Sequence, residues 1–376
     1  MKTTGDQQLV KRINRSVLLR LLRTQPGLSR ARLAAYSGLT KSTVSALVRE
    51  LLDENWLCQA NAPMAADGMG RPSTPLHIDN EIRVLMGLEI GVRQMRVVCV
   101  SLTGQVLATA QQPLSGMEPS KVCKQAVRMV QAAWANLTRR SLRLSGLGVC
   151  LPGAVDEATG TVRFAPNLGW RDEPFLPMLT DALASGGLPD VGIHLHNDGD
   201  AAALGEYEFA SGESEDSLIF VNCDVGVGAG VVLNDRLFTG ARGMAGEIGH
   251  SILQVDGMLC SCGRRGCAET LLGARALDTP QGVQRAANYL GVLIQNLDVM
   301  FNPRVVVVGG QSCSSHPGLL AGAIRTATTY AQSAGVPAPA IRGARYGLQA
   351  AAVGAAAVSL HRFLRPMHQQ TTLENP

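Results

Sequence analysis

Three cysteines and a histidine stand close together in the second half of the chain. Cys260, Cys262 and Cys267 fall within eight residues, and His250 precedes the first of them by ten positions. Three thiolates and one imidazole are the ligand set of a closed structural zinc site, and intervening glycines allow the tight turns that such a site needs. The other interpretation is a group of reduced, buried cysteines without metal. The spacing favours one structural Zn²⁺ per chain over disulfides.

Two successive groups of strands and helices must position these four residues. The first group has three apolar strand-like stretches, one long helical stretch and a fourth strand. In chain order, the strands are 83–91, 95–102 and 105–111, the helix is 120–139, and the last strand is 147–153. The second group repeats this order, with strands over 218–226, 228–233 and 236–240, a helix around 281–300, the strand 305–308 and two alanine-rich helices. Two such units predict an α/β body of two lobes with a cleft between them.

The beginning of the chain has the pattern of three short helices. Apolar residues recur at helical spacing over residues 7–23, and a Pro-Gly pair ends that stretch. Ser29 is expected to cap a second helix that ends at Gly38, and Thr40 is expected to cap a third. A tight turn between the second and third helices is typical of a helix-turn-helix.

Residues behind the third helix predict a wing. Strands are expected over 56–59 and 75–78, and Arg71 lies at the tip of the glycine-bearing loop between them. An arginine there would enter the minor groove of DNA, whose negative potential attracts it. The third helix offers short hydroxyls and cations suited to base edges and phosphates. The predicted contacts from this helix are Lys41, Ser42, Thr43, Ser45 and Arg49.

The charge of the chain is concentrated in this helical head. The whole chain has a net charge of +4, but residues 1–60 contain ten cationic and four acidic residues. A basic head on a nearly neutral body favours a module that binds a polyanion. An ordinary small helical bundle with a solvated charged face is the alternative. Charge, caps and wing together favour double-stranded DNA as a partner.

Composition limits the class of protein. The 376 residues are 46% hydrophobic and 4% aromatic, with dispersed glycine and proline, which excludes collagen-like and disordered polar chains. The polar, basic start lacks the apolar core of a signal peptide, and no run of about 18 apolar residues occurs. We therefore expect a cytoplasmic protein without a membrane span. Its expected domains are a DNA-binding domain over 1–80 and a two-lobed body over 81–376.

Several segments of the body resemble the ROK family of repressors and sugar kinases. They are GARGMAGEIGHSILQVDGMLCSCGRRGCAE from 240, LGVCLPGAVDEATGTVRFAPNLGW from 147, HNDGDAAALGE from 196 and NPRVVVVGG from 302. With the basic head in front, the resemblance covers nearly the whole chain. It implies an α/β fold in which a winged helix-turn-helix precedes a two-lobed, actin-like (ribonuclease H-like) sugar-kinase body. It also implies zinc at the His/Cys/Cys/Cys spacing.

In this family, acidic and amide residues between the lobes bind a sugar. The resemblance assigns that role here to Gly153, Asn167, Asn197, Asp198, Glu247, His250 and Glu269. Paired carboxylates and amides suit vicinal hydroxyls because they accept and donate hydrogen bonds in pairs. His250 would couple the metal to the sugar, because the ring nitrogen that is not bound to zinc remains free to donate. Gly153 and Asn167 also have a simpler interpretation as turn formers.

The resemblance raises the question of kinase activity. Asp198 corresponds to the catalytic base of the family's kinases, but phosphoryl transfer also needs loops around ATP and Mg²⁺. In the first loop, Glu89, Val92 and Arg93 replace the family's aspartate, glycine and threonine. In the second loop the glycines are kept, but Val227 replaces a hydroxyl residue. We therefore expect a protein that is not an enzyme, with Asp198 as a vestigial base.

The interpretation that follows is a sugar-responsive repressor. It would bind a palindromic DNA operator as a homodimer or homotetramer and release it when a sugar or sugar phosphate occupies the cleft. The alternative is an active ATP-dependent sugar kinase with an added DNA-binding head. A sugar-transport protein is a further candidate partner, which nothing in the residues selects or excludes.

Overall fold

The computed structural model describes residues 7–59, 74–210, 217–241 and 243–366. Its N-terminal head contains three helices and a two-stranded antiparallel sheet, which are α1 (Gln7–Thr24), α2 (Arg30–Ser37), α3 (Lys41–Asp53), β1 (Leu57–Gln59) and β2 (Leu76–Ile78). The side chains of Ser29 and Thr40 accept hydrogen bonds from backbone N–H groups at the starts of α2 and α3, as predicted. The loop between the strands, including Arg71, lies outside the described residues.

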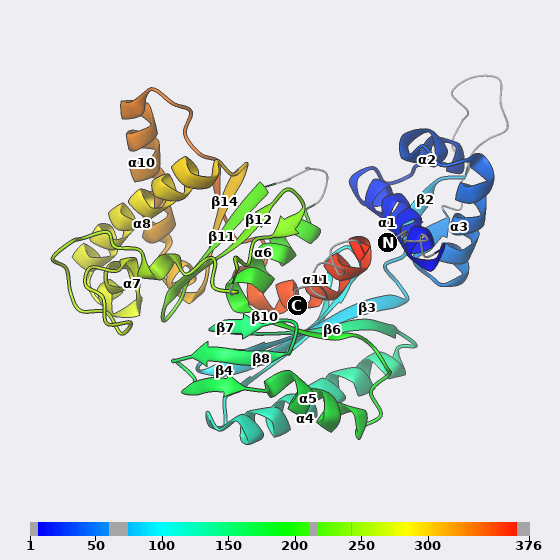
Figure 1. Cartoon of the computed structure of the whole chain (residues 1–376), viewed down its shortest axis with the longest axis horizontal. Helices are drawn as coiled ribbons and strands as arrows, with labels where there is room; N and C mark the ends of the chain where they lie inside the picture. The colour runs from blue at the N-terminus through cyan, green and yellow to red at the C-terminus, as the bar shows by residue number, and fades with distance from the viewer. Residues whose placement is uncertain (1–6, 60–73, 211–216, 242, 367–376) are drawn as a thin grey trace, which may run out of the picture.

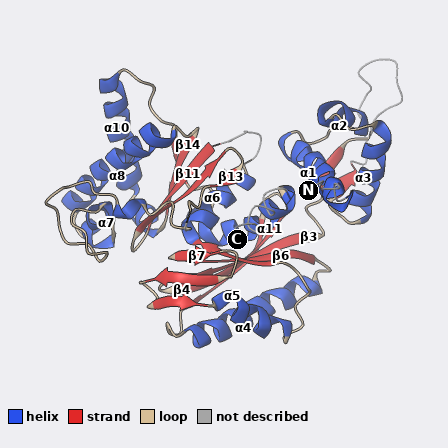
Figure 2. Cartoon of the chain, in the orientation of Figure 1, coloured by secondary structure: helices blue, strands red, loops and turns tan. Residues whose placement is uncertain are grey.

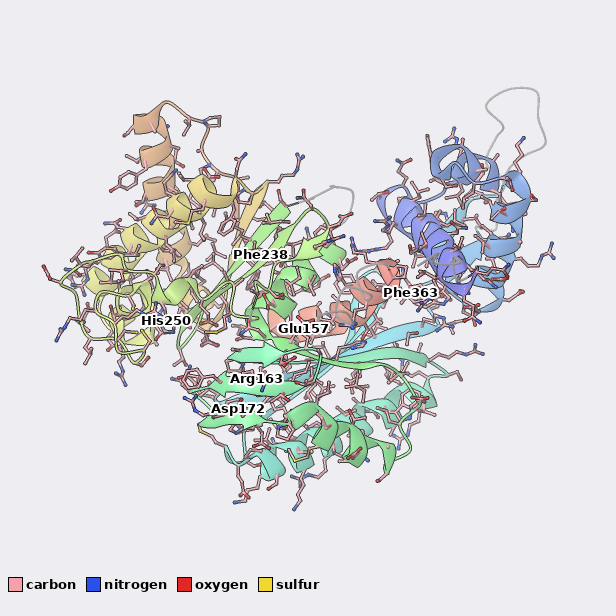
Figure 3. The ribbon with its side chains drawn as sticks, in the orientation of Figure 1. Glu157, Arg163, Asp172, Phe238, His250 and Phe363 are labelled. Atoms are coloured by element: carbon pink, nitrogen blue, oxygen red, sulfur yellow. The ribbon has the colours of Figure 1, made fainter. Side chains whose placement is uncertain are left out.

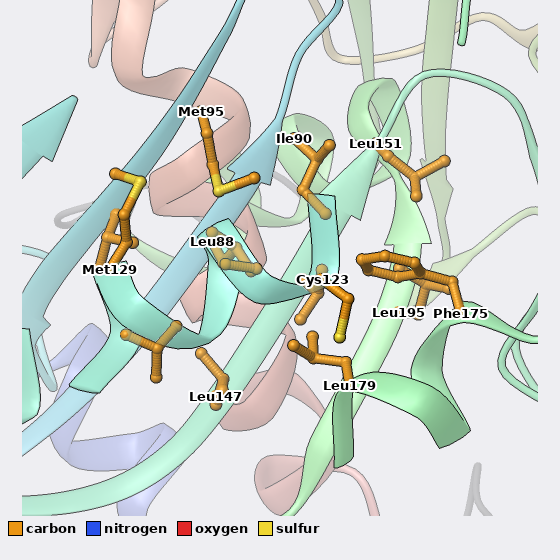
Figure 4. Close-up of a cluster of buried hydrophobic side chains, with 14 of the residues drawn as sticks. Leu88, Ile90, Met95, Cys123, Met129, Leu147, Leu151, Phe175, Leu179 and Leu195 are labelled. Carbon is orange, nitrogen blue, oxygen red and sulfur yellow. The ribbon is translucent and has the colours of Figure 1, made fainter. Parts of the chain in front are cut away.

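The N-terminal lobe is built on a five-stranded sheet of order β10-β6-β3-β4-β5. Its strands are β3 (Arg83–Ile90), β4 (Gln94–Ser101), β5 (Val106–Pro113), β6 (Arg143–Leu151) and β10 (Ile193–Asn197). Helices α4 (Pro119–Arg139) and α5 (Phe175–Ala184) cover one face of this sheet (Figure 1). Leu88 and Leu147 of the sheet pack there against Cys123 of α4 and Phe175 of α5 (Figure 4).

The C-terminal lobe repeats this topology. Its sheet has the order β13-β12-β11-β14-β15, again three antiparallel strands followed by two parallel ones. The strands are β11 (Ser217–Cys223), β12 (Val227–Leu233), β13 (Arg236–Leu237), β14 (Val305–Gly309) and β15 (Ile341–Gly343). The helices of this lobe are α7 (Ala268–Leu272), α8 (Pro280–Phe301), α9 (Gln311–Ser315) and α10 (Pro317–Ala334), and α8 and α10 cover one face of its sheet (Figure 2).

Two helices rich in alanine and glycine fill the space between the lobes. Helix α6 (Asp198–Glu208) packs on β11 and β12, and α11 (Ala350–Leu364) packs on the free face of the N-terminal sheet and against α6 (Figure 1). A Cβ atom at Gly148 would overlap the carbonyl oxygen of Ala355, and one at Gly354 would overlap that of Ala201. These glycines therefore allow the close approach of helix to sheet and of helix to helix.

The head is packed directly against the body. Leu18, Leu22 and Leu51 of the head belong to one apolar core with residues of β4 and α11. Trp56 stacks on Phe363 of α11, with ring centroids 4.2 Å apart and planes within 10°. Figure 3 shows Phe363 on α11 beside the head. Head and N-terminal lobe thus share buried surface and form a common packing unit.

A small three-stranded sheet was not among the predicted elements. It consists of β7 (Ala154–Asp156), β8 (Thr161–Ala165) and β9 (Trp170–Glu173). Arg163 bridges its strands through Asp156 at 2.7 Å and Asp172 at 3.4 Å (Figure 3). Within the described ranges, no helix has the length and apolar character needed to cross a bilayer.

Candidate functional site

The carboxyl ends of parallel strands from both lobes open onto one cleft. Strands β3, β6 and β10 end there from the N-terminal lobe, and β11 and β14 end there from the C-terminal lobe. In open α/β sheets this is the edge at which ligands bind. All seven residues for which a sugar-binding role was predicted line this cleft, namely Gly153, Asn167, Asn197, Asp198, Glu247, His250 and Glu269.

Asn197 has a structural role in this cleft. Its Oδ1 accepts hydrogen bonds from the backbone N–H groups of Gly199, at 2.7 Å, and Asp200, at 3.2 Å, and so caps α6. Its Nδ2 donates to the carbonyl oxygen of Gly153 at 2.9 Å. Gly153 has a φ of +129°, and a Cβ atom there would lie 2.5 Å from the carbonyl oxygen of Phe164. The amide of Asn197 and the turn at Gly153 therefore hold the cleft wall in shape.

Asp198, the first residue of α6, is one of several carboxylates that line the cleft. Its Oδ1 accepts a hydrogen bond from the backbone N–H of Gly199 at 2.9 Å, and its Oδ2 accepts one from Asn222 Nδ2 at 3.2 Å. Burial raises the pKa of Asp198 to about 6, with a further contribution from the nearby carboxylates of Asp224 and Glu247. Asp198 is therefore mostly ionised at pH 7 and mostly protonated at pH 5.

The four predicted metal ligands meet beside the cleft. The candidate ligand atoms of His250, Cys260, Cys262 and Cys267 all lie within 4.8 Å of one another. Cys260 Sγ is 3.7 Å from His250 Nδ1, and Cys262 Sγ is 3.6 Å from Cys267 Sγ. A tetrahedral zinc ion with metal–sulfur bonds of 2.3 Å has ligand–ligand edges of about 3.8 Å. The four residues therefore fit a single zinc ion.

The metal loop, defined here as residues 250–267, also supplies groups to the cleft. His250 places Nδ1 3.7 Å from Cys260 Sγ, and His250 also lines the cleft. Glu269 follows directly after the loop in the first turn of α7 and lines the cleft as well. A metal that fixes this loop would thus also fix two of the predicted sugar contacts.

An ion pair between Glu89 and Arg96 also lines the cleft. Arg96 of β4 donates to Glu89 Oε2 at 2.8 Å and to Gln111 Oε1 at 3.0 Å, and it also donates to the carbonyl oxygen of Leu348. Burial raises the pKa of Glu89 to about 7, in spite of the attraction to Arg96. We did not predict Arg96 from the sequence, although one arginine inside an otherwise apolar strand is a visible signal.

The glycines of the second loop have different environments. A Cβ atom at Gly230 would overlap the carbonyl oxygen of Gly199 in α6, whereas one at Gly228 would meet no atom within 4 Å. Val227 is buried in the core of the C-terminal lobe. Gly230 is therefore required by the packing of α6 on β12, independently of any phosphate contact.

The head presents part of α3 to solvent. Lys41, Ser42 and Arg49 are exposed, whereas Thr43 and Ser45 are half-buried. The hydroxyl of Thr43 lies 2.8 Å from that of Thr40, within the helix cap. Not all of the basic charge faces outward: Lys11 and Arg15 pair with acids of α3 and its C-terminal cap, and Arg20 and Arg23 pair with acids of the body. The charge available to a nucleic acid is therefore smaller than the composition of the head indicates.

Comparison with known proteins identifies the family. The sequence profile of the ROK family matches residues 85–282 and 278–362, and that of the IclR helix-turn-helix domain matches residues 16–60. The chain belongs to the ROK family. This ROK protein is 27% identical over 341 residues to the xylose repressor of Bacillus subtilis (strain 168), covering 84% of the chain and 86% of the relative. It is also 33% identical over 192 residues to a glucokinase of Streptomyces coelicolor, covering 51% and 57%.

A solved structure has the same fold as this ROK protein. It is a ROK family transcriptional regulator described as a homologue of the Escherichia coli MLC protein. It aligns with a TM-score of 0.76 at 22% identity and covers 96% of this chain and 98% of the other. The predicted family and the predicted fold, a winged helix-turn-helix before a two-lobed sugar-kinase body, are both confirmed.

Proposed function

We propose that this ROK protein is a sugar-responsive transcriptional repressor. Its head binds double-stranded operator DNA as part of a homodimer or homotetramer, and its body binds a sugar or sugar phosphate that lowers operator affinity. One observation supports this proposal most directly: all seven predicted sugar contacts line one cleft, in a chain whose N-terminal head matches a helix-turn-helix domain. The likeness to a protein named xylose repressor supports it.

The cleft offers complementary groups to a sugar. The carboxylates of Asp198, Glu247 and Glu269 accept hydrogen bonds from hydroxyls, and the second ring nitrogen of His250 donates one. Zinc, when bound, holds the metal loop so that His250 and Glu269 stay in the cleft. The head contacts DNA through Lys41, Ser42, Thr43, Ser45 and Arg49, with Arg71 in the minor groove.

Loss of kinase activity is also part of the proposal. The Glu89–Arg96 ion pair supports it, because a carboxylate that already pairs with an arginine is less available to a magnesium ion. The likeness to a glucokinase favours the second candidate, an active sugar kinase with a DNA-binding head. ADP formation with ATP, Mg²⁺ and a panel of sugars separates the two. ADP formation in the wild type that disappears in Asp198→Asn would favour the active kinase over a repressor without kinase activity.

Sugar binding is expected to weaken as the pH falls from 7 to 5. A carboxyl of pKa about 6 is ionised in only about one molecule in ten at pH 5, so an interaction that needs the Asp198 carboxylate weakens about tenfold. The measurement is titration calorimetry of the full chain with a sugar selected by thermal-shift screening. Zinc content is determined at both pH values, which separates protonation of Asp198 from loss of metal. The role given to Asp198 is contradicted if the sugar affinity of the wild type does not change with pH. It is also contradicted if the affinity of Asp198→Asn changes with pH as much as that of the wild type.

Operator binding is expected to fall steeply with salt. Six to ten phosphate contacts correspond to a loss of about 10³ to 10⁵ in affinity between 50 and 200 mM salt. Arg49→Gln should reduce the slope of log K against log salt by about one. The probe is double-stranded DNA selected from a random-sequence library by the full chain. The matched control Lys124→Gln removes a cation from α4 of the body and should leave the slope unchanged. A salt-independent affinity would overturn the DNA role.

A further inference from the structure

A charged cluster joins α1 of the head to the body. It combines side chains from the last two turns of α1, the end of α6, the β12–β13 turn and the end of α11. We call this the junction cluster, and its members are Arg20, Arg23, Tyr207, Glu208, Asp235, His361 and Arg365.

Glu208 is the buried centre of the junction cluster. Its carboxylate is 1% exposed and accepts hydrogen bonds from Arg23 and Arg365, and it lies 2.7 Å from His361 Nδ1. Burial alone would raise the pKa of this carboxyl, but the two guanidinium groups hold it well below its ordinary range. The last turn of α6 is therefore tied at once to the head and to α11.

Asp235 brings the C-terminal lobe into the same cluster. It lies in the turn between β12 and β13, 3.4 Å from Arg20 and 3.7 Å from Arg365, and it accepts a hydrogen bond from the hydroxyl of Tyr207. Arg20 and Arg23 are three residues apart on α1, so they share one face of that helix. One face of α1 thus contacts both the end of α6 and a turn of the C-terminal lobe.

The two sides of α1 differ in packing. On the side of α11 and β4 the head shares an apolar core with the body. On the side of the junction cluster, cavities flank the Arg23–Glu208 pair, one lined by Val17 and Thr24 and the other by Pro26 and His77. Charged side chains beside open space can exchange partners, whereas a close-packed core resists rearrangement. The junction cluster is therefore the side of the head that can respond to movement in the body.

Helix α6 runs from the cleft to the junction cluster. Its first residue, Asp198, lies in the cleft, and Glu208 follows about 15 Å further along the helix axis. Nearly all of the helix is buried, and Glu206 also binds Arg342 of β15 at 2.6 Å. A displacement at one end of such a short, enclosed helix moves the other end with it.

We propose that α6 and the junction cluster couple the cleft to the head. This inference rests on the proposed function and names its regulation. A sugar held at Asp198 displaces α6 and the β12–β13 turn relative to α11, and Arg20 and Arg23 carry that displacement to α1. The orientation of α3 changes with it, and operator affinity falls. Glu208 and Asp235 are in this sense positioning residues for the DNA-binding head.

The test uses Arg20→Gln and Asp235→Asn in the full chain. Both side chains are 40–45% exposed, so these variants are expected to fold, and asparagine tolerates the positive φ of 65° at position 235. The matched control Arg12→Gln removes a cation from an exposed position of the same helix. Operator Kd is measured with and without sugar, and sugar Kd is measured with and without operator.

Wild type and Arg12→Gln should show the same sugar-induced loss of operator affinity, within the range of about 5-fold to 150-fold that is usual for allosteric coupling. In the absence of operator, the sugar Kd of both junction variants should lie within about twofold of the wild-type value. Their sugar-induced loss of operator affinity should be less than about threefold. Because coupling between two sites is reciprocal, operator should weaken sugar binding to the wild type by the same factor. This effect of operator on sugar binding should also disappear in both junction variants. A full response in both junction variants overturns this inference alone. A wild-type chain whose DNA binding responds to no sugar overturns the proposed function as well.

Discussion

Cys262→Ser is expected to remove zinc from the chain and to abolish the sugar response. Cys262 is the exposed member of the four ligands, so its replacement removes a metal–sulfur bond with little change in packing. Structural zinc sites contribute about 10–16 kcal/mol of apparent binding free energy at pH 7, and most of this requires the full ligand set. Metal analysis should show zinc falling from one ion per chain to a small fraction of that.

The expected effect on function is large because few apolar contacts hold the metal loop. Its backbone makes two isolated β-bridges and several turn hydrogen bonds, but Ile252, Val255, Met258 and Leu259 are all more than half exposed. Without metal, His250 and Glu269 lose their fixed positions in the cleft. Cys58→Ser, at a half-buried cysteine of the head, is the control and should keep both zinc and response. Unchanged zinc in Cys262→Ser contradicts the site.

Gly354→Ala is expected to destabilise the protein by about 3 kcal/mol or more. The added Cβ atom would overlap the carbonyl oxygen of Ala201 and would lie 2.7 Å from the backbone nitrogen of Ala202. These are main-chain atoms of α6, so the overlap is relieved only if α6 and α11 separate. The measurement is the midpoint of thermal unfolding of the full chain, which should fall by several degrees.

Gly318→Ala provides the matched control. Gly318 lies near the start of α10, and a Cβ atom there would meet no atom within 4 Å. This substitution should be neutral or slightly stabilising, by up to about 1 kcal/mol, because it reduces the freedom of the unfolded chain. Equal effects of the two substitutions would show that helix–helix contact is not what fixes glycine at position 354.

The features predicted correctly from the sequence are those with local causes. The caps at Ser29 and Thr40 depend on residues three positions away, and the four metal ligands lie in one short loop. Alternation and turn residues placed four of the five strands in each of the two large sheets, whereas the edge strands β10 and β15 were not predicted. The cleft was expected from the two successive units, and its residues were expected from the resemblance, which connected distant motifs such as that of Asn167 on the β8–β9 turn.

Features that depend on distant contacts were not predicted. Helix α6 is buried on all sides, so it has no amphipathic period by which it is recognised in the sequence. Arg20 and Arg23 were counted with the DNA-facing charge, but they pair with acids about 200 positions further along the chain. Composition counts a cation wherever it points, and only the packing of α1 on the body shows that these two pair with acids of the body.

The shared core of head and body limits how such regulators can be recombined. Leu18, Leu22 and Trp56 lie against residues near the end of α11, including Leu360 and Phe363, which are among the last described residues of the chain. A new DNA specificity therefore cannot be grafted as an independent cassette cut at residue 80, because each partner would leave apolar surface uncovered. A working chimera must also exchange the body surface that covers this core, which includes the end of α11 and residues of β4 such as Val98 and Val100.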